Sequence, residues 1–200
     1  MNSSSEAVHA AILIGGKSSR MGSPKSLLEF GRLSLLEKIA AAADEVASDV
    51  VLIGDGPAPA ALAGKKRLPD VPGVGGPLAG ILAAFRWRPD AAWIVLSCDL
   101  PFVSGDALRW LLEQRRPDCL GVLPCLDSPE TPEPLLAVYS PSARVALEEA
   151  ARRGDRSIRR ILSREAVLSP RVPEHLRRAW TNVNTPQEWK AALQEAAKCR

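Results

Sequence analysis

The chain has little of what marks several common classes of protein. Its 200 residues include two histidines and four cysteines, and no two cysteines have CxxC spacing. With so few ligands, a zinc site is not expected. The net charge is only +3. A charge of that size does not predict a nucleic-acid partner.

The sequence also lacks the apolar segments that address a chain to membranes or export. No apolar run approaches the roughly 20 residues that a membrane-spanning helix needs. Residues 1–9 are polar and acidic, so we expect a disordered lead-in rather than a secretory signal. Cys98 and Cys119 lie in apolar runs, where a buried thiol is the ordinary explanation. We therefore expect a cytoplasmic protein without a membrane partner.

What the chain does have is a regular alternation of short apolar runs and helical spacing. Its apolar content of 46% and charged content of 24% are ordinary for a globular protein, and residues 10–200 fit a single domain. The alternation predicts an α/β fold, a three-layer α/β/α sandwich with a mostly parallel central sheet of Rossmann-like type. Strands are expected at 10–14, 49–53, 66–68, 92–96, 119–123, 135–139 and 166–168, helices at 34–46, 78–87, 104–114, 142–152, 157–162 and from 185 onward, and a last extended piece at 179–183.

The loop after the first expected strand gathers groups that bind anions. Gly15 and Gly16 let the backbone approach a ligand closely, and successive N–H groups in such a turn can form an anion site. Ser18 adds a hydroxyl, and Arg20 and Lys25 add positive charge. The spacing matches neither a Walker A loop nor a dinucleotide fingerprint. The loop is thus a candidate triphosphate site, and the alternative is a Gly/Ser surface turn with unrelated cations.

Two aspartates also follow strand-like runs. Asp99 comes just after the run 92–96, where a carboxylate can hold Mg²⁺ together with substrate phosphates. Otherwise it caps the next helix, although Ser104 is better placed for that. Asp70 precedes a Pro/Gly-rich loop, where it either contacts a nucleobase or sugar or is an ordinary turn aspartate. Ligands bind at the carboxyl ends of parallel strands, so both residues and the Gly15 loop are expected at one edge.

The last candidates lie near the C-terminus. Asn182 and Asn184 flank one apolar residue and would face the same side of an extended segment. Two amides can recognise a pterin-like ring, or Asn184 is simply a turn residue before the capped final helix. The second half also carries many arginines, which form either a solvated face or an anion-binding surface.

Six motifs together resemble the molybdenum cofactor guanylyltransferase family, within the GT-A-like nucleotidyltransferases. Residues 13–28 resemble its L-A-G-G-x-S-x-R-M-G-x-D-K-x-L-L pattern, and Asp70 with residues 75–81 resembles its D…GPLAG segment. The other matches are 97–102 with CD-x-P-F/Y, 134–139 with P-L-x-A-x-Y, then 154–157 and 182–186. They follow the family's order from about residue 10 to 190. Two positions depart from the pattern: Ile14 replaces Ala, and Pro24 replaces the Asp before Lys25.

The resemblance implies a nucleotidyltransferase of GT-A-like fold that transfers GMP from GTP to molybdenum-molybdopterin and releases pyrophosphate. The alternatives are a related enzyme that uses CTP or another phosphorylated acceptor, and a nucleotide-binding module without turnover. The family setting also allows transient contacts with other cofactor-biosynthesis proteins or with molybdoenzymes. The implied roles are catalysis for Arg20, Lys25 and Asp99; Mg²⁺ or Mn²⁺ binding for Asp99; acceptor binding for Asn182 and Asn184; and nucleotide binding for Leu13, Ile14, Gly15, Gly16, Ser18, Lys25, Asp70, Gly76, Pro77, Leu78 and Asp99.

Overall fold

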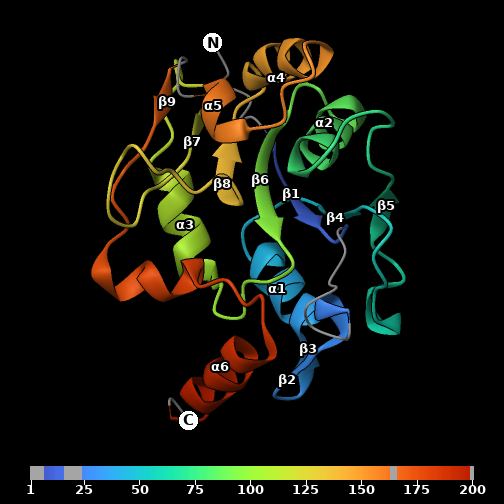
Figure 1. The fold of residues 1–200 in the computed structure, drawn as a ribbon, viewed down its shortest axis with the longest axis vertical. Coiled ribbons are helices and arrows are strands. Elements are labelled where there is room, and N and C mark those ends of the chain that lie inside the picture. The colour runs from blue at the N-terminus through green and yellow to red at the C-terminus, as the bar shows by residue number, and fades with distance from the viewer. Residues whose placement is uncertain (1–6, 16–23, 163–165, 199–200) are drawn as a thin grey trace.

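A seven-stranded sheet forms the centre of the molecule in the computed structural model, which describes residues 7–15, 24–162 and 166–198 (Figure 1). Six α-helices and three 3₁₀ helices surround it in these ranges. The strands are β1 (Val8–Leu13), β2 (Glu29–Phe30), β3 (Leu33–Ser34), β4 (Val50–Ile53), β5 (Lys66–Leu68), β6 (Ala92–Ser97), β7 (Gly121–Val122), β8 (Leu136–Tyr139) and β9 (Val167–Leu168). The α-helices are α1 (Leu35–Asp44), α2 (Pro77–Trp87), α3 (Gly105–Glu113), α4 (Ala143–Arg152), α5 (Ile158–Leu162) and α6 (Pro186–Lys198), and the 3₁₀ helices are η1 (Lys25–Leu27), η2 (Ala60–Leu62) and η3 (Glu174–Trp180).

The strand order places β1 in the middle of a parallel block. The order is β5-β4-β1-β6-β8-β7-β9, and β5, β4, β1 and β6 all pair in parallel. β8 is antiparallel to both β6 and β7, whereas β7 and β9 pair in parallel. The mostly parallel sheet expected from the sequence is therefore confirmed. Because β5, β4, β1 and β6 run the same way, their carboxyl ends meet at one edge.

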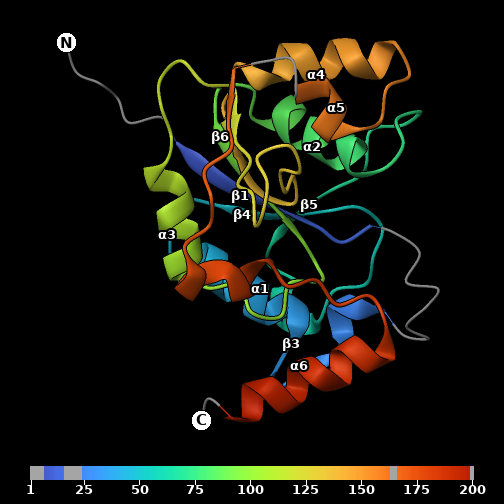
Figure 2. The same ribbon diagram turned by 60° about the vertical axis from the view of Figure 1, so that its left-hand side comes forward.

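The two faces of the sheet are covered by different helices, as Figure 2 shows. Along β1, Ala10 and Ile12 are buried in a cluster with α1 and α3, and the alternate residue Ala11 is buried in a cluster with α2, α4 and α5. This period of two is what a strand covered on both faces requires. The three-layer α/β/α sandwich is confirmed. None of the described helices is long and apolar enough to cross a membrane.

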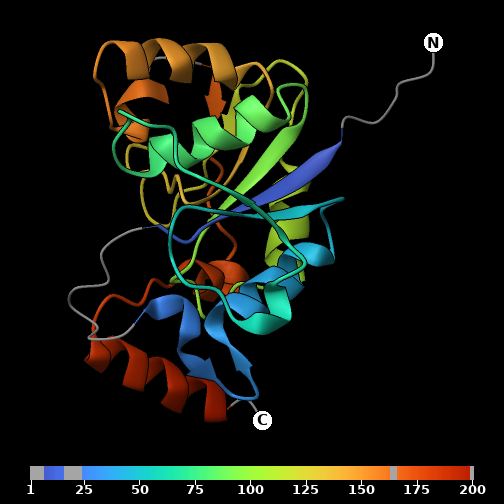
Figure 3. The same ribbon diagram turned by 90° about the vertical axis from the view of Figure 1, so that its right-hand side faces the viewer.

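A further layer lies outside α1, where α6 and the β2–β3 hairpin are neighbours (Figure 3). The Phe30 and Trp189 rings lie 5.6 Å apart between centroids, and Phe30 contacts Phe102 edge-on at 5.7 Å. Capping boxes begin both helices in this region, from Ser34 to Glu37 and from Thr185 to Glu188. Such caps satisfy the free N–H groups of a helix start. They fix the residues at which α1 and α6 begin.

Three expectations need correction. β1 begins at Val8, inside the expected lead-in. Only residues 121–122 of the run 119–123 form a strand, because β7 pairs with just two residues of β8 and two of β9. The extended piece at 179–183 is wrong: Ala179 and Trp180 close the 3₁₀ helix η3. Its apolar residues are buried against α3, and the Trp180 indole N–H donates to the Leu136 carbonyl at 3.1 Å.

Candidate active site

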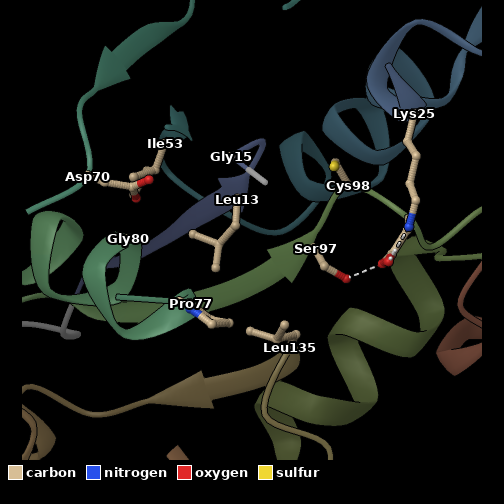
Figure 4. Close-up of a pocket in the computed structure, with 12 residues that line it drawn as sticks. Leu13, Gly15, Lys25, Ile53, Asp70, Pro77, Gly80, Ser97, Cys98 and Leu135 are labelled. Atoms are coloured by element: carbon tan, nitrogen blue, oxygen red, sulfur yellow. Dashed lines mark hydrogen bonds and ion pairs between the residues drawn. The ribbon is translucent and has the colours of Figure 1, made fainter. Parts of the chain in front are cut away.

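A cavity of about 500 Å³ opens at the carboxyl edge of the parallel strands (Figure 4). β1 and β4 contribute residues at their ends, β6 contributes the segment that follows it, and the start of α2 contributes a further wall. The Gly15 segment, Asp70 and Asp99 therefore come together at one edge, as expected for parallel strands. The lining residues are Leu13, Gly15, Lys25, Ile53, Asp70, Gly76, Pro77, Gly80, Ser97, Cys98, Asp99 and Leu135.

One end of this cavity holds a cluster of polar groups around Asp99. The Lys25 ammonium lies 3.2 Å from one Asp99 carboxylate oxygen and donates to the Asn184 amide oxygen at 2.7 Å. The Ser97 hydroxyl donates to the other Asp99 oxygen at 2.5 Å. The Asp99 and Lys25 side chains are only 18% and 13% exposed. Water screens a partly buried ion pair of this kind less than a surface pair, and its ammonium can donate to a phosphate.

Asp70 forms the opposite end of the cavity, and Gly15 and Gly80 pack closely against its carboxylate. Figure 4 shows Asp70 and Lys25 at opposite ends of the cavity. A Cβ on Gly15 would lie 3.1 Å from one Asp70 carboxylate oxygen, and a Cβ on Gly80 would lie 3.3 Å from the other. Gly54 has a φ of +105°, which disfavours any larger residue there. Burial, and secondarily the nearby Asp55, raises the pKa of Asp70 above its ordinary value.

A second cavity of about 210 Å³ adjoins the first. The two share Ser97, Asp99 and Leu135, so the Asp99 cluster stands where they meet. Asn182 lines the second cavity, whereas Asn184 contacts Lys25. The two amides thus meet different groups, and residues 181–184 do not form a strand, so acceptor binding by both stays a prediction. The complete lining is Ser97, Asp99, Leu100, Glu133, Pro134, Leu135, Arg159, Trp180 and Asn182.

Among the described residues predicted to bind the nucleotide, all but two line the first cavity. The side chains of Ile14 and Leu78 are buried in the core on opposite faces of the sheet. They point away from the cavity, so only their backbones could meet a nucleotide. A Cβ on Gly56 would lie 1.9 Å from the Ile14 carbonyl oxygen, so only glycine fits at position 56. Gly16, Ser18 and Arg20 lie outside the described residues.

Several lining residues were not among the sequence candidates. Ile53 and Ser97 are the last residues of β4 and β6, and the rule that ligands bind at carboxyl ends of strands could have found them. Gly80 and Leu135 lie in the motifs at 75–81 and 134–139, but neither was assigned a role from the sequence. Cys98 also lines the cavity, and burial, together with the neighbouring Asp99 charge, raises the pKa of its thiol to about 11. With a pKa raised in this way, the thiol is mostly in its protonated, less nucleophilic form at neutral pH.

The donor set suits a divalent cation that shares its ligands with a substrate. Asp99 offers a carboxylate, and the Ser97 hydroxyl and Asn184 amide oxygen lie within one hydrogen-bonded cluster with it. In the described ranges no group of three or more His, Cys, Asp or Glu side chains could hold a metal ion alone. Mg²⁺ prefers one or two carboxylates plus waters and phosphates. The residues therefore fit Mg²⁺ bound together with a nucleotide.

Comparisons with known proteins identify the family of the chain. The model of the MobA-like NTP transferase domain matches residues 10–170. A probable molybdenum cofactor guanylyltransferase from Pelotomaculum thermopropionicum is 36% identical over 141 residues, covering 70% of this chain and 67% of that protein. The molybdenum cofactor guanylyltransferase of Sinorhizobium fredii is 31% identical over 208 residues, and the match covers 94% of this chain and 94% of that protein.

Solved structures extend the likeness to the whole fold. Molybdopterin-guanine dinucleotide biosynthesis protein A from Archaeoglobus fulgidus superposes with a TM-score of 0.78 at 28% identity, covering 95% of this chain and 99% of that one. The 2-C-methyl-D-erythritol 4-phosphate cytidylyltransferase of Thermus thermophilus has a TM-score of 0.69 at 19% identity, covering 96% and 98%. The second likeness shows a shared fold alone, so the fold by itself does not select the nucleotide.

Proposed function

Because the chain belongs to the MobA-like NTP transferase family, we propose that it transfers GMP from GTP to the terminal phosphate of molybdenum-molybdopterin. The products are the guanine dinucleotide cofactor and pyrophosphate. One observation carries the proposal beyond the family: the Lys25–Asp99 cluster stands where two adjoining cavities meet. A transferase that joins two substrates needs such an arrangement, with one substrate on each side of the charged group.

The larger cavity takes the nucleotide and the smaller one takes the acceptor. With the base near Asp70, the phosphates extend toward Lys25 and Asp99 at the other end of the cavity. An acceptor phosphate oxygen then attacks the α-phosphorus, a new P–O bond forms, and the bond to the pyrophosphate leaving group breaks. A phosphate monoester is largely ionised at pH 7, so the attack needs no general base. Lys25, and by family resemblance Arg20, stabilises the charge that develops on the phosphoryl oxygens.

Asp99 is the residue that would hold Mg²⁺, with Mn²⁺ as a chemically similar substitute. The bound cation supplies charge neutralisation on the phosphates. Lys25 and Ser97 hold the Asp99 carboxylate through separate oxygens, which fixes its orientation toward the junction of the two cavities.

The base end of the larger cavity supports guanine over cytosine. Asp70 offers carboxylate oxygens there, and these can only accept hydrogen bonds when ionised. Guanine presents two adjacent donors, its N1–H and its 2-amino group. The pairing of two donors with carboxylate oxygens gives strong, charge-assisted hydrogen bonds.

The test is pyrophosphate release measured with GTP, Mg²⁺ and molybdopterin, omitting each in turn. We expect release only when all three are present, and we expect Asp99→Asn to abolish it. Asp106→Asn is the matched control, because Asp106 is an exposed residue on α3 that pairs with Arg109 at 2.8 Å. Release with CTP in place of GTP would identify the related cytidylyl activity instead. Binding of GTP without release by any combination would contradict the proposal and indicate a module without turnover.

A further inference from the structure

The smaller cavity contains a pair of charged side chains that the transfer chemistry does not use. The Arg159 guanidinium lies 3.3 Å from a Glu133 carboxylate oxygen. It also donates through Nε to the Pro132 carbonyl at 2.7 Å. Arg159 and Glu133 both line the cavity that Asp99 shares with the nucleotide site.

Hydrogen bonds to backbone carbonyls hold both members of this pair in place. The Glu133 backbone N–H donates to the Pro124 carbonyl at 2.7 Å, which closes the loop that carries it. Arg159 projects from α5, and it also lines a third cavity of about 370 Å³. Its side chain therefore forms a wall between two cavities. Glu133 is 27% exposed and Arg159 is 50% exposed, so both charges remain accessible to a ligand.

We propose that Glu133 and Arg159 recognise the aminopyrimidinone edge of the acceptor's pterin ring. The inference rests on the proposed function, which places the acceptor phosphate beside Asp99 and so leaves the rest of the acceptor in the smaller cavity. A pterin edge presents, in order, an amino donor, a ring N–H donor and a carbonyl acceptor. The Glu133 carboxylate accepts from the two donors, and the Arg159 guanidinium donates to the carbonyl oxygen.

The other lining residues suit a flat heterocycle. Trp180 lines the cavity while its indole N–H is bonded to the Leu136 carbonyl, so its ring is fixed. Leu135 and Pro134 add apolar surface, and Asn182 adds an amide that can meet a remaining ring nitrogen. Polar and apolar side chains therefore share the lining, so the cavity offers both apolar surface for a ring and polar groups for its edge.

The first experiment separates ring recognition from turnover. Binding of free pterin is measured by its fluorescence in the presence of GTP and Mg²⁺, and compared with lumazine, whose 2-oxo group replaces the 2-amino donor. Wild type should prefer pterin by roughly 10- to 100-fold, because a charge-assisted hydrogen bond is lost and an oxygen faces the carboxylate. Glu133→Gln should abolish this preference. Failure of wild type to bind pterin, or an unchanged preference in Glu133→Gln, would overturn the inference.

The second experiment uses turnover with molybdopterin. Glu133→Gln and Arg159→Met should each raise the KM for molybdopterin about 10-fold or more and leave the KM for GTP unchanged. Absence of turnover in wild type would refute the proposed function, whereas normal turnover with unaltered KM in both variants would refute only this inference.

Two variants control for a purely structural effect. Asp127→Asn breaks an ion pair with Arg177 (2.8 Å) on the same loop as Glu133 but outside the cavity. Arg160→Met removes the neighbouring arginine of α5, which pairs with Asp155 and does not line the cavity. We expect both to keep the wild-type KM for molybdopterin. If Asp127→Asn raises the KM for molybdopterin as much as Glu133→Gln does, Glu133 acts by anchoring its loop, and the proposed recognition role is overturned.

Discussion

Gly80→Ala should narrow the larger cavity without unfolding the protein. Gly80 lies inside α2, and a Cβ there would come 2.7 Å from the Leu13 Cδ2 atom. Carbon atoms in contact prefer about 3.5–4.0 Å, so Leu13 must move by about 1 Å. Leu13 lines the cavity and can yield in that direction. The added methyl group also comes 3.3 Å from an Asp70 carboxylate oxygen.

The expected stability change is small because two effects oppose each other. Alanine in a helix interior is favoured over glycine by about 1 kcal/mol. Overpacking a core costs about 1–3 kcal/mol. The free energy of unfolding should therefore fall by about 0–2 kcal/mol. We expect a loss near the lower end of this range, because Leu13 lines the cavity and can move into it. The KM for GTP should rise about 10-fold, because the added methyl group narrows the cavity and a binding loss of about 1.4 kcal/mol is tenfold in affinity.

Urea unfolding and steady-state kinetics measure the two effects separately. Gly64→Ala is the control, because a Cβ at Gly64 would meet nothing within 4 Å. Leu13→Val should relieve the contact, so the double variant should lose less stability than the two single changes added together. If the Gly80→Ala variant is as stable as wild type and its KM for GTP is unchanged, the assignment of this cavity to the nucleotide is refuted.

Three further outcomes follow from the charges of the described residues. Lys25→Met should lower kcat by about 10²- to 10³-fold, as removal of one preorganised donor does, and a wild-type kcat would exclude Lys25 from the reaction. The pKa of Asp70 is raised by burial and by Asp55, so the folded chain binds more protons than the unfolded chain, and stability falls as the pH rises through the folded pKa. Asp70→Asn should therefore unfold at higher urea than wild type at pH 7, and the gain should vanish as the pH falls below the ordinary value of 3.8. Burial lowers the pKa of His9, although the nearby Asp49 carboxylate acts in the opposite direction. Wild type should therefore lose stability as the pH falls from 6.5 through the lowered pKa of the folded state. The His9→Gln variant should lose less stability when urea unfolding is measured across the same pH range.

The parts of the fold that local patterns determine were predictable from the sequence. Apolar runs identified the strands of the parallel block, and Ser34 with Glu37 identified the start of α1. Asp99 was predictable as a site residue because it follows a buried strand whose carboxyl end must face the ligand edge. In these cases the signal lies within a few residues of the feature.

The remaining features depend on contacts between distant segments. Lys25 and Asn184 are 159 positions apart, and Arg159 and Glu133 are 26 apart, so no local pattern reports either pair. The run 179–183 has the composition of a strand, but Trp180 is bonded to β8 and packed on Trp110, and this tertiary contact selects a 3₁₀ helix. Local propensity gives way to packing at such positions.

The most direct test of guanylyl transfer by this protein is a competition among nucleotides. The wild-type protein is incubated with molybdenum-molybdopterin, Mg²⁺ and equal concentrations of GTP, CTP, ATP and UTP, and the cofactor product is identified by mass spectrometry. We predict the guanine dinucleotide form as the main product, formed together with an equal amount of pyrophosphate. A cytosine dinucleotide product, or an unmodified cofactor in the presence of all four nucleotides, would contradict this prediction.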